Sequence, residues 1–124
     1  MIKRFDGATL WSSDLNRILP FYRDTMGLSV GLESPGFVIL GDLEQPTLCL
    51  GTHSKVHGPN PDPHRFLVQL ATDDIHAEVL RLAKAGIPIF QQPEHQGGGF
   101  WIATCEDPDG NLVQLTHMGK EPEE

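Results

Sequence analysis

The chain has little cysteine and no long apolar run. Its two cysteines, Cys49 and Cys105, lie far apart in the sequence and form no CxxC pair. A disulfide framework is therefore not expected, and this cysteine usage is typical of a reduced, cytoplasmic protein. No apolar stretch approaches the roughly 20 residues that cross a bilayer, and no charged, apolar and small-residue leader is seen, so we expect no membrane association.

Positive charge is also scarce. The chain carries 9 Lys and Arg residues against 17 Asp and Glu residues, a formal net charge of -8 over 124 residues. This balance disfavours nucleic acid or an anionic membrane surface as a partner and is better suited to a neutral or cationic small molecule. A chain of this length is typical of one domain that buries about two thirds of its unfolded surface.

Two parts of the chain repeat one pattern. Asp14 precedes Gly27 by 13 positions, and Asp73 precedes Gly86 by 13 positions. The amphipathic segment between each pair predicts a helix that ends at a glycine. Its cap is Ser13 or Asp14 in the first helix and Asp73 or Asp74 in the second. Pro20 lies inside the first segment, so we expect that helix to be kinked.

Apolar alternation predicts strands on both sides of each helix. The predicted strands are 8–12, 28–33, 37–40 and 47–52 in the first half, and 66–72, 87–91, 100–106 and 112–117 in the second. Each half is thus strand, helix and three strands. This order predicts an α+β fold of two βαβββ modules that form a curved mixed sheet around a cleft, with helices on its outer face.

The predicted modules belong to a single domain. Module 1 spans about residues 6–52 and module 2 about residues 65–118, joined by a linker at about 53–64 and followed by an acidic tail at 119–124. The linker contains three prolines, so we expect no helix or strand in it. Its histidines, His53, His57 and His64, are interpreted as solvated because these prolines prevent the helix that would align them.

Residues 106–115 fix the register of the last strand. Pro108 and Gly110 favour a tight turn, and the side chains of Asp107 and Asp109 can accept hydrogen bonds from nearby backbone amides. After this turn, alternate side chains point to opposite faces. One set is Val113, Leu115 and His117, and the other is Leu112, Gln114 and Thr116.

Sorting the strand residues by parity gives one apolar face and one mixed face. The apolar face is predicted to form the core and holds Leu10, Leu48, Leu50, Phe66, Val68, Leu70, Val113 and Leu115. The mixed face combines aromatic, aliphatic, hydroxyl and amide side chains, as ligand pockets do. From it we predict a ligand-binding site of Thr9, Trp11, Phe37, Cys49, Leu67, Gln69, Ile102, Thr104 and Gln114. The alternative is that the curved sheet packs on itself and the two glutamines bond each other or water.

Several motifs resemble the vicinal oxygen chelate superfamily, which includes glyoxalase I, extradiol dioxygenases, fosfomycin resistance enzymes and bleomycin resistance proteins. The motifs are Asp14-Leu15, Phe21-Tyr22-Arg23-Asp24, Gly27-Leu28 and Glu106-Asp107-Pro108-Asp109-Gly110-Asn111. The resemblance extends over residues 9–116 and implies the two-module fold. These motifs belong to the scaffold, so they say little about chemistry.

Metal-dependent members of that superfamily carry His, Gln or Glu at facing positions on the inner strands. The resemblance places those positions at Gly7, Leu67 and Gln114, with Cys49 as a fourth. Gly7 and Leu67 have no donor atom, whereas a divalent ion needs several imidazole or carboxylate ligands at about 2.0–2.2 Å. We therefore predict no metal and no cofactor, which disfavours glyoxalase, dioxygenase and fosfomycin transferase activity.

The bleomycin resistance branch is the metal-free relative that the chain most resembles. That resemblance implies a homodimer that holds an apolar or cationic ligand without altering it. Two alternatives stay open: a metal-dependent lyase or dioxygenase whose ligands are misregistered, and a metal-independent enzyme that uses Gln114, His95 or Cys49. Glu94 with His95, next to the Gly97–Gly99 turn or flap, is a further candidate acid and base pair.

Overall fold

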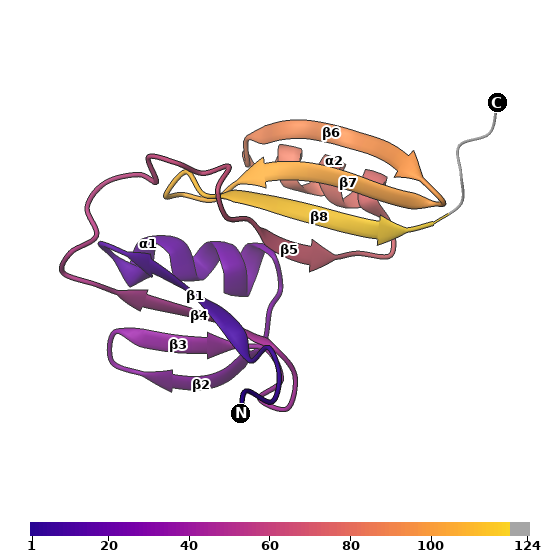
Figure 1. Cartoon of the computed structure of the whole chain (residues 1–124). Coiled ribbons are helices and arrows are strands. Elements are labelled where there is room, and N and C mark those ends of the chain that lie inside the picture. Colours follow the sequence, from indigo (N-terminus) through magenta and orange to yellow (C-terminus); the bar gives the residue numbers. More distant parts are fainter. Residues whose placement is uncertain (120–124) are drawn as a thin grey trace. The chain divides into compact units, whose positions relative to one another are not determined.

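The computed structural model of the protein describes residues 1–119. It contains two compact units. The boundary between them in the sequence lies between Gly58 and Pro59, inside the predicted linker. Each unit has one four-stranded mixed sheet and one helical segment (Figure 1). The predicted acidic tail lies outside the described residues from Lys120 onward. Within residues 1–119, no helix has the length and apolar character that a membrane crossing requires.

The first unit follows the predicted βαβββ order. Its elements are β1 (Gly7–Ser12), α1 (Leu15–Pro20), η1 (Phe21–Thr25), β2 (Val30–Ser34), β3 (Phe37–Leu40) and β4 (Thr47–Thr52). The strands lie in the order β1-β4-β3-β2, with β1 parallel to β4 and the other neighbours antiparallel. The helix α1 packs on β1 and β4, as Figure 1 shows.

The helix of the first unit changes its type at Pro20. Asp14 caps its start, since the carboxylate accepts a hydrogen bond from the backbone N–H two residues on at 3.0 Å. The α-helix ends at Pro20, and η1 continues as a π-helical turn in which the N–H of Met26 donates to the carbonyl of Phe21 at 2.8 Å. Proline has no N–H and its ring crowds the preceding turn, so a wider turn follows it. The predicted kink takes this form.

The second unit repeats the order. Its elements are β5 (Val68–Ala71), α2 (Ile75–Lys84), β6 (Ile89–Gly97), β7 (Phe100–Glu106) and β8 (Leu112–Met118). The strands lie in the order β5-β8-β7-β6, with β5 parallel to β8. The helix α2 packs on β6, β7 and β8.

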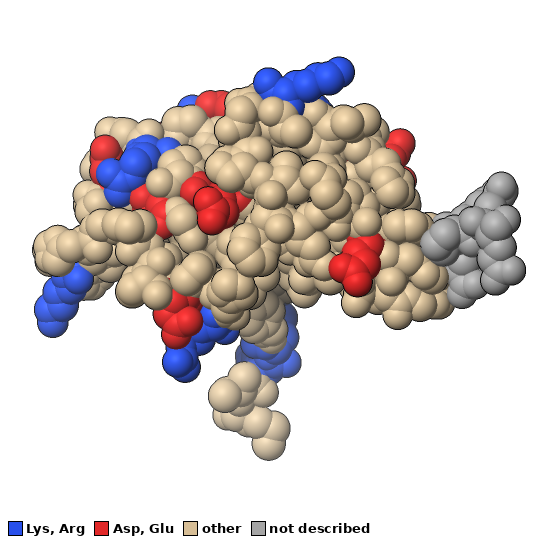
Figure 2. Space-filling model, turned by 90° about the horizontal axis from the view of Figure 1, so that it is seen from above, with Lys and Arg blue, Asp and Glu red and all other residues tan. Residues whose placement is uncertain are grey.

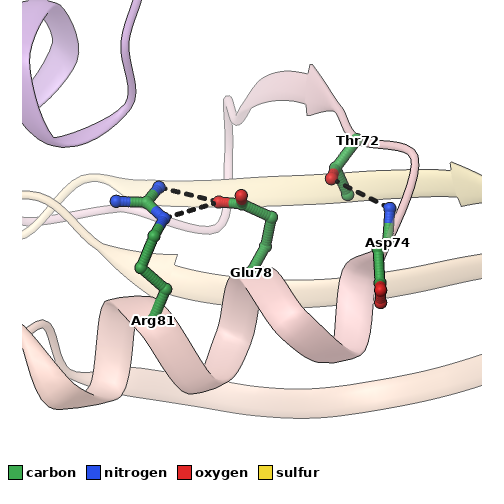
Figure 3. A network of polar contacts seen from close by, with 4 residues as sticks. All are labelled: Thr72, Asp74, Glu78 and Arg81. Carbon is green, nitrogen blue, oxygen red and sulfur yellow. Dashed lines mark hydrogen bonds and ion pairs between the residues drawn. The ribbon is translucent and has the colours of Figure 1, made fainter.

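Polar contacts fix the start and the exposed side of α2 (Figure 3). The N–H of Asp74 donates to the hydroxyl of Thr72 at 3.2 Å, and the Asp74 carboxylate accepts from a backbone N–H of the first turn at 3.1 Å. One turn further on, Arg81 donates to Glu78 at 2.7 Å. The opposite side of the helix supplies the buried residues Ile75, Val79 and Leu82.

The core follows the predicted parity except at Phe66. The strand residues Leu48, Leu50, Val113 and Leu115 are buried as predicted, and Leu10, Val68 and Leu70 are half-buried. The prediction for Phe66 is wrong, because its side chain is 56% exposed. The reason is that β5 begins only at Val68, so the alternation of the strand does not extend to Phe66.

The carboxylate of Asp107 organises the turn before β8. Its Oδ1 accepts from the backbone N–H groups of Asp109 at 2.8 Å and Asn111 at 2.9 Å, and its Oδ2 accepts from the Asn111 amide at 2.8 Å. Gly110 supplies the positive φ of 76° that the turn requires. The Asn60 amide donates to Asn111 Oδ1 at 2.8 Å, which ties the residues after the unit boundary to this turn.

Candidate functional site

The predicted ligand residues lie on the faces of the two sheets that point away from the core. We call the face of β1, β4, β3 and β2 the first open face and that of β5, β8, β7 and β6 the second open face. The first open face holds Thr9, Trp11, Phe37 and Cys49. The second holds Gln69, Ile102, Thr104 and Gln114, with half-buried Leu67 directly before β5. That the two groups form one ligand site stays a prediction.

An aromatic group covers part of the first open face. The ring centroid of Trp11 lies 5.9 Å from that of Phe37 and 5.3 Å from that of His53. A Cβ atom on Gly51 would lie 2.5 Å from Trp11 Cζ3 and 3.0 Å from Phe37 Cδ2, so the two rings pack directly over this glycine. The Trp11 side chain is nevertheless 43% exposed. It can therefore present an aromatic surface to a ligand.

Cys49 lies in the middle of the first open face. It pairs with Thr9 of β1 and Ile39 of β3, and its Sγ lies 4.0 Å from the hydroxyl of Thr47. None of these neighbours is a base or a cation that would generate a thiolate. The arrangement is that of a small apolar side chain in a sheet and gives no support to Cys49 as a nucleophile.

A row of polar side chains crosses all four strands of the second open face. Gln69 of β5 pairs with Gln114 of β8, Gln114 with Thr104 of β7, and Thr104 with Gln91 of β6. The amide of Gln69 donates to Gln114 Oε1 at 2.8 Å. The Thr104 hydroxyl donates to Gln91 Oε1 at 3.4 Å, and the Gln91 amide donates to Glu94 at 2.7 Å. We call these five residues the amide row.

The members of the amide row differ in exposure. Thr104 is only 4% exposed, so it supports Gln91 rather than reaching outward. Gln114 is half-buried and Gln69 is exposed. Their mutual hydrogen bond is the one that the alternative of a sheet packed on itself anticipates. Both side chains still have surface that a ligand can reach.

Glu94 and His95 do not come together. Glu94 lies opposite Ile102 and bonds to Gln91 on the second open face, whereas His95 lies opposite Trp101 on the helix side. The rings of His95 and Trp101 are 5.1 Å apart, and His95 Nε2 accepts a hydrogen bond from a backbone N–H of the glycine turn at 3.0 Å. Successive residues of a strand point to opposite faces, so the two cannot act as an acid and base pair.

Neither open face carries a cation from its strands. The eight strands of residues 1–119 contain no Lys or Arg. On the face drawn in Figure 2, basic side chains stand in small separate groups, several beside acidic ones, and uncharged residues make up most of the surface. The arginines that pair with nearby carboxylates are Arg4, Arg23, Arg65 and Arg81. An anionic ligand on either sheet would find no opposite charge there.

The residues that the resemblance predicts at the metal-ligand positions do not fit a divalent metal. Leu67 has no donor atom, and Gln114 and Cys49 supply only a neutral amide and a thiol. A Cβ atom on Gly7 would lie 3.0 Å from the N and Oγ1 atoms of Thr47, so a coordinating side chain has no room there. Residues 1–119 include no group of three or more His, Cys, Asp or Glu side chains with the geometry to hold a metal. The alternative of a metal-dependent lyase or dioxygenase with its ligands at other positions therefore has no supporting donor cluster in the described part of the chain.

Sequence reasoning missed three residues of the open faces. Gln91 was assigned to the end of a strand, because the register shifts of β6 hide its pairing with Thr104 from a simple alternation. His53 was assigned to the linker, yet its ring contacts Trp11. Gly51 carried a signal that was available, since a glycine inside a strand often marks the close approach of another group.

Comparisons with known proteins agree with the fold. The family described as the Glyoxalase/Bleomycin resistance protein/Dioxygenase superfamily matches residues 4–115. A glutathione transferase FosA of Serratia marcescens is 27% identical over 124 residues, a match that covers 96% of this chain and 83% of that protein.

Solved structures give the same result. The trypanothione-dependent glyoxalase I of Leishmania major has a TM-score of 0.73 at 21% identity, with 94% of this chain and 88% of that chain covered. A lactoylglutathione lyase of Agrobacterium tumefaciens has a TM-score of 0.71 at 23% identity, with 94% of each chain covered. At these identities the likeness concerns the fold, and activity has to be argued from the open faces.

Proposed function

Because the chain belongs to the glyoxalase/bleomycin resistance protein/dioxygenase superfamily, we propose that it binds a small apolar or cationic molecule on its open sheet faces without a metal ion. The observation that carries this proposal is the donor set at the superfamily's ligand positions. Gly7 has no room for a side chain and Leu67 has no donor atom, so only the sulfur of Cys49 and the neutral amide of Gln114 remain, fewer than the three protein ligands of a typical site.

The composition of the open faces supports the ligand class. Trp11 and Phe37 offer aromatic surface, and a cation stacked on such a ring gains about 0.5–2 kcal/mol. The net charge of -8 attracts cations, and the strands offer no Lys or Arg to an anion. A neutral or positively charged ring system is therefore favoured over a carboxylate or phosphate.

A second candidate function is a glutathione-dependent transferase. The match to the glutathione transferase of Serratia marcescens over almost the whole chain favours it. In such a reaction the glutathione sulfur forms a bond to an electrophilic carbon, and the leaving group departs from that carbon. One feature of this chain opposes it: glutathione carries two carboxylates, and the strands have no Lys or Arg to receive them.

We test the first proposal with three probes of the same size: benzamidinium, benzamide and benzoate. Protein freed of metal with EDTA is titrated with each probe, followed by NMR of the backbone amides. We expect benzamidinium and benzamide to bind at least about fivefold more tightly than benzoate, and to be recovered unchanged. Trp11→Ala should weaken benzamidinium binding by about threefold to thirtyfold. Phe90→Ala, at another exposed aromatic residue, should leave it unchanged.

The second candidate is tested on the same preparation. Reduced glutathione and 1-chloro-2,4-dinitrobenzene are mixed with the protein, with and without added Mn²⁺, and chloride displacement is followed by absorbance. We expect no rate above that without protein. Turnover that requires Mn²⁺, or a stoichiometric transition metal in protein purified without chelator, would replace metal-free binding with an enzyme.

A further inference from the structure

We infer that Gln69 and Gln114 recognise the edge of a neutral cis-amide, such as a lactam or an imide, which presents one hydrogen-bond donor beside one acceptor. The inference rests on the proposed function, because it names the chemistry that the second open face binds. It is carried by the hydrogen bond between the two glutamines and by the atoms that this bond leaves unused.

The glutamine pair contains two carbonyl groups and two NH₂ groups, and its hydrogen bond uses one of each. The Nε2 of Gln69 donates to Oε1 of Gln114 at 2.8 Å. Among residues 1–119 no other partner bonds the Oε1 of Gln69 or the Nε2 of Gln114. These two atoms are a free acceptor and a free donor on neighbouring strands. A cis-amide offers the complementary pair, since its N–H can donate to Gln69 and its carbonyl can accept from Gln114.

This pattern does not depend on the orientation of the two amides. If both side-chain amides are rotated by 180°, Gln114 becomes the donor of the bond and Gln69 the acceptor. The free carbonyl then belongs to Gln114 and the free NH₂ group to Gln69. One acceptor and one donor remain in either case, so the complementary ligand is the same.

The neighbours of the pair select a neutral edge. A carboxylate has no donor, so it would leave the Oε1 of Gln69 unpaired and set a negative charge against that oxygen. Thr104 uses its proton on Gln91, and Gln91 uses an N–H on Glu94, so the rest of the amide row adds no donor toward the pair. Glu94 places the row's single ionised group at its far end, where it repels an anion. An amidinium has two donors and would leave the Gln114 NH₂ group unpaired.

The sheet also holds the pair in position before a ligand arrives. Gln114 lies on β8, which has strands on both sides, and is half-buried. The hydrogen bond to Gln69 restricts the rotamers of both side chains. Groups that are ordered in advance lose less conformational entropy on binding. The pair is therefore better suited to recognition than two free surface glutamines.

The test uses δ-valerolactam and its N-methyl derivative, which differ only by the N–H donor. Protein labelled with ¹⁵N is titrated with each, and the side-chain NH₂ signals of Gln69 and Gln114 are followed. We expect the lactam to shift both signals and the N-methyl compound to bind at least about fivefold more weakly, as the loss of one hydrogen bond predicts. Glutarate, the anionic probe, should leave both signals unchanged.

Variants then assign the effect to the pair. Gln114→Met and Gln69→Met keep the length of the side chain and remove the amide, and each should weaken lactam binding by at least about fivefold. Gln92→Met is the control, because Gln92 is an exposed glutamine on β6 and lies outside the pair. It should leave lactam binding unchanged. Backbone amide spectra show whether each variant keeps the fold.

Three outcomes overturn the inference: no binding of the lactam, equal binding of the lactam and its N-methyl derivative, or unchanged affinity in both glutamine variants. In each of these cases the proposed function is still supported if the protein binds benzamidinium and Trp11→Ala weakens that binding. A protein that binds the lactam through the glutamines, but whose binding of benzamidinium is absent or unaffected by Trp11→Ala, gives the reverse result.

Discussion

Cys105 is a buried residue whose ionisation the fold changes. It lies on β7 with its side chain 1% exposed. Burial raises the pKa of its thiol to about 11, and the nearby Asp107 carboxylate adds to this increase. The thiol is therefore protonated throughout the neutral range and has no role as a nucleophile.

This raised pKa predicts a loss of stability in alkali. The folded thiol keeps its proton up to about pH 11, whereas the unfolded thiol loses it near the ordinary value of 9.0. The contribution is thus fully present below pH 9 and is lost as the pH rises toward 11. We expect the free energy of unfolding in urea to fall by about 2 kcal/mol between pH 8 and pH 10.5 from this group.

The matched controls are the two cysteine variants. Cys105→Ala should remove that part of the pH dependence, while Cys49→Ala should retain it, because Cys49 is half-buried and lies elsewhere in the fold. Equal alkaline slopes in both variants would show that the Cys105 thiol is not protected from ionisation.

Gly51 is the residue that brings the two rings of the first open face together. A methyl group at this position would lie 2.5 Å from the Trp11 ring and 3.0 Å from the Phe37 ring. We expect Gly51→Ala to lower the free energy of unfolding by about 1–3 kcal/mol, as overpacking does. In a Trp11→Ala background the same substitution should cost less, because the ring that it displaces is gone. Additive effects in this double-mutant cycle, measured by urea unfolding, would contradict the packing.

At the scale of single residues, parity placed the side chains well where a strand was regular. Gln69, Thr104 and Gln114 lie on one face as expected, and Trp101 lies on the opposite face beside His76. Alternation cannot reveal which amide bonds to which, because that depends on rotamers. The donor and the acceptor that the glutamine pair leaves free could therefore be identified only from the structure.

The helices and strands themselves follow from local chemistry. Of the candidate caps, Asp14 and Asp74 form, and Gly27 and Gly86 adopt the positive φ values of 79° and 83° that end a helix. Strands β3, β4 and β7 have the predicted bounds, whereas β6 extends to Gly97 through three register shifts. Bulges break the two-residue repeat, so the continuation of β6 had no periodic signal. The π-helical form of η1 also goes beyond what a proline alone predicts.

The turn before β8 depends on one carboxylate. Asp107 accepts three hydrogen bonds of 2.8–2.9 Å and is 5% exposed. Asp107→Ala leaves buried donors without their acceptor, so we expect the free energy of unfolding to fall by about 2–4 kcal/mol. The measurement is equilibrium unfolding in urea, with ligand absent.

A matched aspartate separates this role from a general effect of charge. Asp73 is exposed and lies outside the turn, so Asp73→Ala should change the free energy of unfolding by no more than about 0.5 kcal/mol. If the two variants were equally stable, the hydrogen bonds of Asp107 would not hold the turn.

At the scale of the whole molecule, the repeat of two βαβββ modules could be predicted because each carries the same cap, helix and strand signals. The superfamily could also be predicted, since its motifs are scaffold motifs and match residues 4–115. Ligand identity could not, because the chemistry of the open faces depends on side-chain hydrogen bonds and ring contacts. The Trp11 and His53 contact joins β1 to the segment after β4, and no spacing rule marks it.

The assembly of the molecule is a further prediction at this scale. The resemblance to bleomycin resistance proteins implies a homodimer, and the first sheet has an edge suited to one. The strand β2 forms that edge (Figure 1), and all five of its residues are exposed. Its apolar side chains Val30 and Leu32 are 40% and 55% exposed, beside Leu43 at 53%. An exposed apolar edge strand is a liability in a monomer and is usually covered.

We therefore expect light scattering after size exclusion to give a mass of twice 13.7 kDa at micromolar concentration. Leu32→Lys places a charge on the β2 edge and should shift the protein toward the monomer, because two like charges would meet across a symmetric contact. Leu80→Lys is the control, since Leu80 is 63% exposed and lies on the helix α2, not on the β2 edge. A monomeric native protein would contradict the homodimer itself. A dimer that survives Leu32→Lys but dissociates with Leu80→Lys would move the contact from the sheet edge to the helix, and the two lysine variants thus locate the interface as well as test it.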